Sequence, residues 1–382
     1  MEFSFNDDQN AIRDLAAQIF SDRATDEFML DFSRSDETYD AVLWQTLAEQ
    51  GLLGVAVPES AGGTGLGLIE LGLVLEEQGK RVAPVPLFAS LVLGGLPLTE
   101  FGSADQQQRY LAALATGEAK FSAALAEVGM NAAVATAVHA KQSGDDWVLK
   151  GSKAVVPDGA VADYILVPAQ TSAGETWFIV AAQSPGVSVT PVEFSLAGER
   201  AAHLALDGVT VAAGEVLGAV GQGAEISEWL LQRANVGQCA LQVGVTEAAM
   251  RRTAEYISER KQFGIPLGSF QALAMRMADS YIDVEAIRST YWLALWRLSE
   301  NLDARAETRA AKWWACDAAH RIVSTAQHLH GGMGADIEYP IHRFFLLAKH
   351  ISYSLGNASQ QLEQLGRLLA EDDSLGFRAL EV

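Results

Sequence analysis

Cysteine, positive charge and long apolar runs are all scarce in this sequence of 382 residues. The only two cysteines are Cys239 and Cys316, which argues against a disulfide scaffold or a thiolate metal cage and favours a reducing cytoplasm. Lysine and arginine number 27 against 48 aspartates and glutamates, so the formal net charge is −21. A chain this acidic is a poor match for nucleic acid or anionic lipid. No apolar run reaches the roughly 18 residues of a membrane span, and residues 1–8 do not resemble a signal peptide.

Common catalytic motifs are missing as well. The run Gly62–Gly67 is rich in glycine but lies between helical segments, so it lacks the strand-to-helix context of a dinucleotide fingerprint and is interpreted as a structural turn. There is no P-loop and no Gly-x-Ser-x-Gly elbow. His328 and His330 do not have the spacing of a zinc motif, so no metal site is expected. Function therefore has to be inferred from longer segments.

Three zones of different composition follow one another along the chain. Residues 1–120 have the apolar spacing of amphipathic helices. Residues 121–220 contain short segments rich in Val, Thr and Ile, bounded by turn residues, which is typical of antiparallel strands. Residues 221–382 return to longer helical patterns, which cover 225–259, 270–299, 304–330 and 341–370. The sequence predicts an α+β multidomain protein with an N-terminal helical domain, a middle antiparallel β domain and a C-terminal domain like a four-helix bundle.

Two segments of the third zone have unusual chemistry. Residues 256–271 form a basic, aromatic turn with Gly and Pro between two long helical patterns, and this turn contains Arg260. Residues 328–343 contain Gly331, Gly332 and Gly334 next to a helix end, where exposed backbone N–H groups suit an anionic pyrophosphate. Each segment alone is also compatible with an ordinary connection, in which Arg260 is solvated and the glycine run is a flexible turn.

Together with segments from the first two zones, they resemble the acyl-CoA dehydrogenase family over nearly the whole chain. The matching stretches are Leu52–Gly63, Leu75–Gly79, Ala124–Glu127, Gly151–Lys153, Ala162–Asp163, Arg260-x-Gln-Phe-Gly-x-Pro and Phe270–Gln271. The resemblance implies an oxidoreductase that binds FAD between the β domain and the C-terminal helices. It also implies α,β-dehydrogenation of an acyl-CoA thioester, with electrons passed to an electron-transfer flavoprotein. Members form dimers or tetramers in which the partner subunit helps to hold the adenosine pyrophosphate.

The cofactor contacts of the family can be carried over residue by residue. The implied FAD-binding residues are Arg260, Phe263, Gln271, His328, Gly331, Gly332, Asn357, Leu125 and Ala126. Arg260 is chemically suited to this role, because its guanidinium is a forked donor for phosphate oxygens. Three departures occur. His328 stands where the family usually has Gln, Ala126 replaces a Thr whose hydroxyl faces the flavin, and residues 155–157 read Val-Val-Pro in place of Trp-Ile-Thr.

The general base is the main departure. The family abstracts a proton from the α-carbon of the acyl group with a carboxylate held in a dry site. The usual Glu position is occupied by Leu355, which cannot accept a proton. Some members carry the Glu on the first C-terminal helix, but there the matching positions are Gln232 and Ala234. Other acids in the third zone are interpreted as solvated or capping groups, with Glu247 the most interesting because its helix is apolar: Glu225, Glu228, Glu247, Asp336 and Glu338.

Three hypotheses remain open at this point. The chain is an active FAD-dependent acyl-CoA dehydrogenase with a displaced base, or it is a catalytically incomplete subunit whose sister chain supplies the carboxylate. The second is favoured by the stretch 355–361, which resembles subunits of heteromeric acyl-CoA dehydrogenases of actinobacterial and proteobacterial type, some acting on steroid side-chain thioesters. The third hypothesis is a non-enzymatic acyl-CoA or protein-binding module, which the intact cofactor segments disfavour.

Overall fold

The computed structural model of the chain describes residues 4–125, 137–192, 201–372 and 375. Ala126 and Glu127 lie outside the described residues. The elements follow the predicted order of helices, strands and helices, so the expected three-part α+β fold is confirmed. Contacts divide the chain into two compact units. The first unit comprises Met1–Arg34, Gly72–Ala83 and Asn235–Val382, and the second comprises Ser35–Leu71 and Pro84–Ala234.

The first zone forms short capped helices. Asn6 begins α1 with a capping box, and Asp40 begins α3 by accepting hydrogen bonds from two backbone N–H groups. Gly63 packs in the predicted turn, where a Cβ would lie 2.1 Å from the Val57 oxygen. The helices are α1 (Asp7–Arg23), α2 (Asp26–Phe32), α3 (Ala41–Glu49), α4 (Leu68–Arg81), α5 (Leu96–Phe101), α6 (Ala104–Gln106) and α7 (Ala112–Ala115). Between them lie the 3₁₀-helices η1 (Leu52–Gly54) and η2 (Glu59–Ala61) and the π-helical η3 (Phe88–Gly95) and η4 (Gln107–Leu111).

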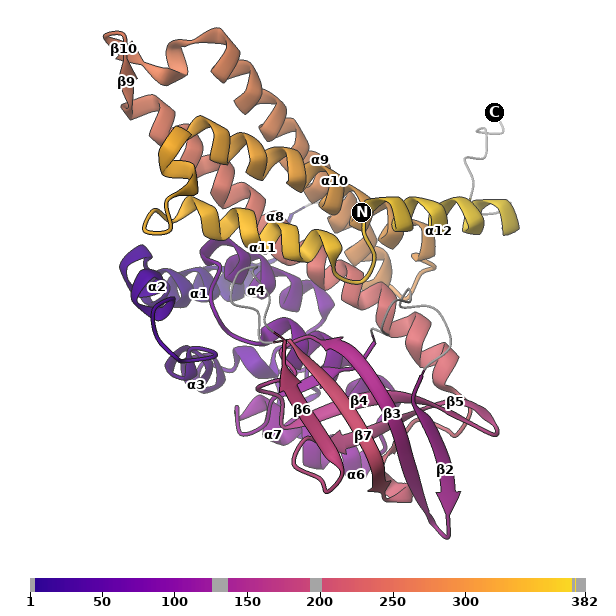
Figure 1. Cartoon of the computed structure of the whole chain (residues 1–382). Helices are drawn as coiled ribbons and strands as arrows, with labels where there is room; N and C mark the ends of the chain where they lie inside the picture. Colours follow the sequence, from indigo (N-terminus) through magenta and orange to yellow (C-terminus); the bar gives the residue numbers. More distant parts are fainter. Residues whose placement is uncertain (1–3, 126–136, 193–200, 373–374, 376–382) are drawn as a thin grey trace. The chain divides into compact units, whose positions relative to one another are not determined.

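The second zone forms one mixed sheet in the order β6-β7-β3-β2-β4-β5-β8, with β1 paired to β4 (Figure 1). Most pairs are antiparallel as predicted, whereas β1 and β2 each run parallel to β4. The strands are β1 (Phe121–Ala123), β2 (His139–Ser143), β3 (Asp146–Val156), β4 (Tyr164–Thr171), β5 (Gly174–Ala181), β6 (Val187–Pro191), β7 (Ala202–Val211) and β8 (Val216–Leu217), with η5 (Ala213–Glu215) before β8. Inward side chains of β3, β4 and β7 build an apolar core that includes Trp147, Ile165 and Leu204.

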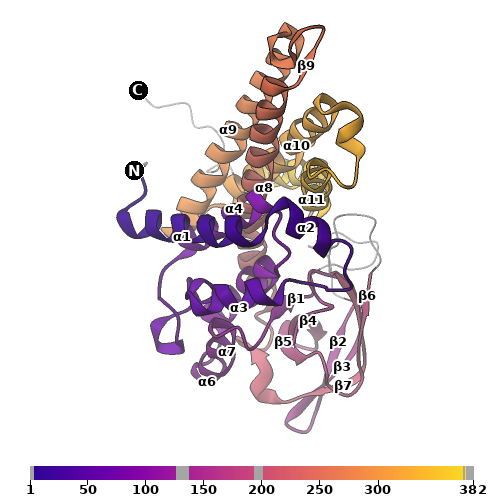
Figure 2. The same ribbon diagram turned by 90° about the vertical axis from the view of Figure 1, so that its left-hand side faces the viewer.

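The third zone forms long helices joined by short turns. Figures 1 and 2 show α8 and α9 running side by side up to the hairpin of β9 and β10. The elements are α8 (Gly223–Glu259), β9 (Lys261–Gln262), β10 (Ile265–Pro266), η6 (Leu267–Ser269), α9 (Gln271–Ser299), α10 (Arg305–Leu329), η7 (Gly331–Ala335), α11 (Ile341–Tyr353) and α12 (Ala358–Glu371). Glycine brings α4 and α8 into contact, since a Cβ on Gly244 would lie 2.0 Å from the Glu76 backbone oxygen. Within the described part of the chain, no helix has both the length and the apolar character to cross a membrane.

The structure divides the helical pattern predicted over 341–370. α11 ends at Tyr353, and α12 begins at Ala358. Between them Leu355 and Gly356 have left-handed backbones, with φ of +55° and +96°. Asn357 then caps α12 through a capping box with Gln360. Apolar periodicity continues through this turn, so the break follows from backbone conformation and capping rather than from hydropathy.

Candidate functional site

The turn that contains Leu355 is held by amide groups. Gln361, which is buried, donates from Nε2 to the Leu355 carbonyl oxygen at 2.9 Å. The Asn357 side chain accepts from the Gln360 N–H at 3.1 Å, and the Gln360 side chain accepts from the Asn357 N–H at 2.9 Å. Neither amide can accept a proton at neutral pH. The turn therefore keeps a defined shape although its central side chain is apolar.

Lys312 anchors the helix end that precedes this turn. Its fully buried ammonium donates to the Ile351 carbonyl at 2.7 Å and to Gln238 Oε1 at 2.5 Å. A cation at the carboxyl end of α11 also interacts favourably with the helix dipole. Cys239 and Cys316 are free and buried, and burial raises the pKa of the Cys239 thiol to about 12. That thiol is therefore neutral at physiological pH.

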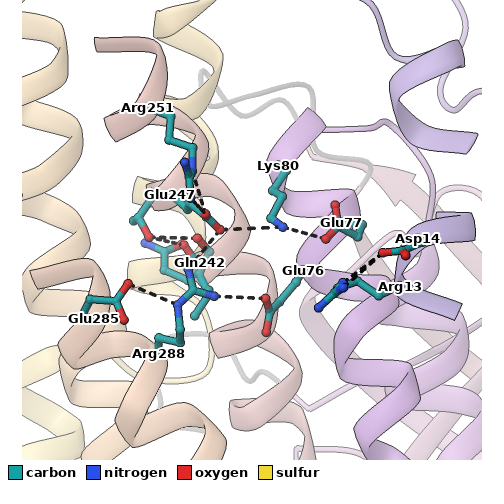
Figure 3. A network of polar contacts seen from close by, with 12 residues as sticks. Arg13, Asp14, Glu76, Glu77, Lys80, Gln242, Glu247, Arg251, Glu285 and Arg288 are labelled. Atoms are coloured by element: carbon teal, nitrogen blue, oxygen red, sulfur yellow. Dashed lines mark hydrogen bonds and ion pairs between the residues drawn. The ribbon is translucent and has the colours of Figure 1, made fainter. Parts of the chain in front are cut away.

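All five acids considered as displaced bases have polar partners, and four of these acids lie outside the network of Figure 3. Glu338 pairs with Arg34 at 2.8 Å, and Asp336 accepts from the backbone N–H of Glu338 at 2.9 Å. Near the start of α8, Glu225 accepts a hydrogen bond from Gln222 at 3.1 Å, and Glu228 accepts one from Gln232 at 3.3 Å. These contacts agree with the interpretation of the four groups as capping or surface carboxylates.

Glu247, the fifth candidate, belongs to a charged network between α4, α8 and α9 (Figure 3). It pairs with Arg251 at 2.8 Å, with Arg288 at 3.0 Å and with Lys80 at 3.7 Å. Burial by itself would raise the pKa of Glu247, but the charges of Lys80 and Arg288 and hydrogen bonds from Arg251 and Arg288 outweigh burial and lower it. A carboxylate with a lowered pKa is a weak proton acceptor, so Glu247 is a poor candidate for the base.

Glu76 in the same network was not singled out by the sequence. Its side chain is buried beside Arg288, with 3.5 Å between Oε2 and Nη1, and Oε1 has no hydrogen-bond partner among the described residues. Burial raises the pKa of Glu76 to about 8. Charge balance points the same way, because the network in Figure 3 joins four acids to three bases: Glu76, Glu77, Glu247 and Glu285 with Lys80, Arg251 and Arg288. Its place directly after the apolar run 71–75 is the only sequence signal for this burial.

The predicted phosphate-binding turn is exposed. Arg260, directly after α8, is exposed and has no side-chain hydrogen bond or ion pair with any described residue. Phe263 is 93% exposed and has a left-handed backbone with φ of +55°. Its ring meets the Phe270 ring edge-on at 6.3 Å between centroids. Gln271 is exposed at the first position of α9. These three side chains are available to a ligand or to a second chain.

Two glycines of the glycine run face open space, and the third is closely packed. A Cβ on Gly331 or Gly332 would meet no heavy atom within 4 Å, so both open toward free space. A Cβ on Gly334 would lie 2.2 Å from the Gln327 oxygen, so this glycine serves packing. His328 is exposed in the last turn of α10. The first two glycines therefore fit the predicted approach of an anionic group to backbone N–H groups.

Tyr256 of α8 lies one helical turn before Arg260 and contacts the residue that precedes the glycine run. The Tyr256 ring stacks on His330 at 4.3 Å between centroids, and its backbone carbonyl accepts from the Arg260 N–H at 2.8 Å. Sequence reasoning missed this tyrosine, because its spacing on α8 fits ordinary helix packing. Leu125 belongs to the second unit, where it is buried. So does Val155, whose φ is +44° at an irregularity in β3.

A surface cavity of about 550 Å³ lies between α9 and α10 and is lined by polar side chains that include Arg276 and Arg321. It contains none of the predicted site residues. Within the described ranges, no three His, Cys, Asp or Glu side chains gather closely enough to hold a metal ion. The predicted site residues of the first unit therefore lie in separate places, since the glycine run precedes the start of α11 and the Leu355 turn follows its end.

Three family models match the chain in sequence order. They are described as the N-terminal, middle and C-terminal domains of acyl-CoA dehydrogenase, and they match residues 6–118, 123–209 and 221–370. Acyl-CoA dehydrogenase FadE27 of Mycobacterium tuberculosis is 37% identical over 380 residues, which cover 97% of this chain and 99% of that protein.

Two solved structures are similar over almost their whole length. The ChsE4-ChsE5 complex from Mycobacterium tuberculosis matches with a TM-score of 0.92 and 37% identity, covering 97% of this chain and 100% of the matched chain. A variant of the Tcur3481-Tcur3483 steroid ACAD matches with a TM-score of 0.89 and 41% identity, covering 96% of this chain and 99% of the matched chain. Both names denote an assembly of two different proteins.

Proposed function

Because the chain belongs to the acyl-CoA dehydrogenase family, we propose that it takes part in FAD-dependent α,β-dehydrogenation of an acyl-CoA thioester as the subunit without a base. The observation that carries this proposal is Leu355 in a turn that buried groups hold in shape. A sister chain supplies the carboxylate that takes the proton from the α-carbon. The heteromeric names of two structural neighbours support such an assembly.

The residues present fit a flavin dinucleotide. The Arg260 guanidinium has no described partner and can donate two N–H groups to one phosphate. The open backbones of Gly331 and Gly332 can approach a pyrophosphate closely. Gln271 and His328 offer further donors, with Phe263, Asn357, Leu125 and Ala126 as the remaining proposed contacts. FAD, when bound, supplies the acceptor for the hydride that leaves the β-carbon.

The proposed substrate is a coenzyme A thioester, and the proposed electron acceptor is an electron-transfer flavoprotein. The word steroid in the name of the neighbour at 41% identity supports an acyl group on a steroid side chain. The alternative is a chain that is active alone through a displaced base. The polar partners of the five candidate acids weigh against a displaced base. Glu247 in particular forms ion pairs with three cations.

The test compares the chain purified alone with the chain co-expressed with the family member from a neighbouring gene. Flavin per chain is measured by absorbance, and activity is measured by acyl-CoA-dependent reduction of an artificial acceptor. We expect the chain alone to be inert and the complex to be yellow and active. Replacing the sister chain's base Glu by Gln is the matched control, and it should abolish activity. Turnover by the chain alone would establish the displaced base instead, and a complex without flavin would favour a binding module.

A further inference from the structure

The segment from His330 to Pro340 has to be ordered before its amides can hold a phosphate. It contains three glycines, and glycine loses more backbone entropy on ordering than any other residue. A ligand that ordered this segment on binding would bind more weakly for that reason. Some other part of the fold must therefore hold the segment in its binding conformation beforehand.

A single ring from α8 contacts this segment at its start, middle and end. Tyr256 stacks on His330 with 4.3 Å between ring centroids and an angle of 22° between the planes. Its hydroxyl lies 3.9 Å from the Met333 sulfur. Its ring also meets Tyr339 edge-on at 6.5 Å. His330 and Tyr339 are themselves 5.2 Å apart, so the two ends of the segment close on each other and on Tyr256.

His330 is held as a neutral ring. Its Nδ1 faces the Ala326 carbonyl at 2.8 Å, and because a carbonyl only accepts, Nδ1 carries the proton. Nε2 is buried and has no hydrogen-bond partner in the part of the chain that the structure describes, so a second proton on Nε2 would find no acceptor there. Burial lowers the pKa of His330 accordingly. A neutral imidazole stacked on a phenol is a stable arrangement at physiological pH.

The backbone of Tyr256 lies one helical turn before Arg260. The Tyr256 carbonyl accepts from the Arg260 N–H at 2.8 Å, and the Arg260 carbonyl accepts from the Leu267 N–H at 2.8 Å. These two bonds fix the backbone where α8 gives way to the hairpin. The last turn of α8 thus carries the ring that contacts the glycine run and leads directly into Arg260.

We propose that Tyr256 is a positioning residue that holds the glycine run in the geometry needed to bind the phosphates of a dinucleotide. It acts through the ring contacts with His330 and Tyr339 and need not touch the ligand. This inference rests on the proposed function, because FAD is the ligand whose phosphates the site would hold.

The test uses three variants of the full chain in whichever form binds FAD, alone or with its sister chain. Tyr256→Leu removes the aromatic contacts, Tyr256→Phe keeps the ring and removes the hydroxyl, and Tyr281→Leu makes the same change at an exposed tyrosine of α9. The measurements are the Kd for FAD after reconstitution of apoprotein and the hydrogen exchange of amides 331–335 in the apoprotein.

We expect Tyr256→Leu to raise the Kd for FAD about tenfold, since each lost aromatic pair corresponds to roughly a two- to tenfold change in affinity. Hydrogen exchange of amides 331–335 should accelerate, while hydrogen exchange of the amides in α10 and α11 stays unchanged. Tyr256→Phe and Tyr281→Leu should remain within about twofold of the wild type. Should Tyr256→Leu not fold, Tyr339→Leu releases the far end of the segment without altering α8 and should act in the same direction.

Different failures have different meanings. A wild-type protein that binds no FAD in either form overturns the proposed function and this site with it. A wild type that binds FAD, together with a Tyr256→Leu variant of equal affinity, overturns only the role of Tyr256. Faster exchange spread evenly through the unit would also overturn that role, because it would show a general loss of stability.

Discussion

Leu355 occupies a left-handed position that most side chains avoid. Its φ of +55° is followed by Gly356 at +96°, and the turn is fixed by Gln361 and by Lys312 one helical turn earlier. A β-unbranched side chain in this conformation costs roughly 1–2 kcal/mol relative to glycine. The fold therefore maintains the turn in the absence of an acidic side chain, and a carboxylate introduced there should take up the same position.

The first prediction concerns the substitution Leu355→Glu. In the complex whose sister chain has its base Glu replaced by Gln, we expect acyl-CoA-dependent reduction of an acceptor to rise about 100-fold, within the usual contribution of a positioned general base. The measurement is steady-state turnover at matched flavin content.

Leu355→Gln is the control, because it has the same shape as Glu but cannot take a proton. Equal turnover by the Glu and Gln variants would contradict the prediction and would mean that the substrate or flavin geometry is incomplete as well.

At the scale of elements, α4, α8 and α9 are joined by charges in an otherwise apolar interface (Figure 3). α4 and α8 approach closely because Gly79 of α4 and Gly244 of α8 place no side chain between them. Arg288 then contacts three carboxylates, those of Glu76, Glu247 and Glu285. With one positive charge fewer than negative charges, the network is balanced when Glu76 keeps its proton.

The second prediction concerns pH and stability. The pKa of Glu76 is about 8 in the folded chain and 4.5 for the free side chain. Between these values the folded state binds a proton that the unfolded state does not, so stability falls as pH rises, by about 1.4 kcal/mol per pH unit. We expect Glu76→Gln to remove this slope, making the variant more stable than the wild type by several kcal/mol at pH 8. Urea unfolding from pH 5 to pH 9 measures the effect.

The exposed Glu255 of α8 provides the matched control. Glu255→Gln should leave the pH dependence of the wild type intact. If Glu76→Gln and Glu255→Gln gave the same unfolding midpoints at every pH, Glu76 would not carry a raised pKa in the folded chain.

At the level of the whole molecule, the single chain exposes an apolar side chain that a second chain can cover. Phe263 is 93% exposed at the end of the β9–β10 hairpin, so it contributes almost nothing to the stability of an isolated chain. Full burial of such a side chain would contribute about 1.5–3 kcal/mol. An exposed phenylalanine in a left-handed turn is therefore expected to serve association or cofactor binding.

The third prediction tests this role with Phe263→Asn, since asparagine tolerates a left-handed backbone. We expect the melting temperature of the dilute chain to stay within about 2 °C of the wild type, while the share of oligomer and the flavin content both decrease. Light scattering after size-exclusion chromatography and flavin absorbance measure these two quantities.

Val42→Asn changes another exposed apolar side chain, on α3, and should leave oligomer and flavin content as in the wild type. If Phe263→Asn lowered the melting temperature and left association and flavin content unchanged, the side chain would serve only the fold of its own hairpin.

Local patterns in the sequence determined most of the secondary structure. The apolar period of 3.6 residues predicted the starts of α8, α9 and α10 to within two residues, because the apolar face of a helix is determined by the residues of that helix. The absence of a proton acceptor at position 355 was equally a property of the sequence. Hydropathy could not reveal the turn at 354–357, since its cause is a left-handed backbone and a capping side chain.

Only the tertiary structure decided what the polar groups do. Glu247 and Glu76 lie near each other in space but 171 positions apart in the chain. Lys80 and Arg288 act on both carboxyls, and the pKa shifts are opposite because burial dominates at Glu76, whereas Glu247 also receives hydrogen bonds from Arg251 and Arg288. Tyr256 meets His330 and Tyr339 for the same reason, as a result of helix packing. Electrostatic and aromatic interactions act through distances in space, and these distances are set by the whole packed chain.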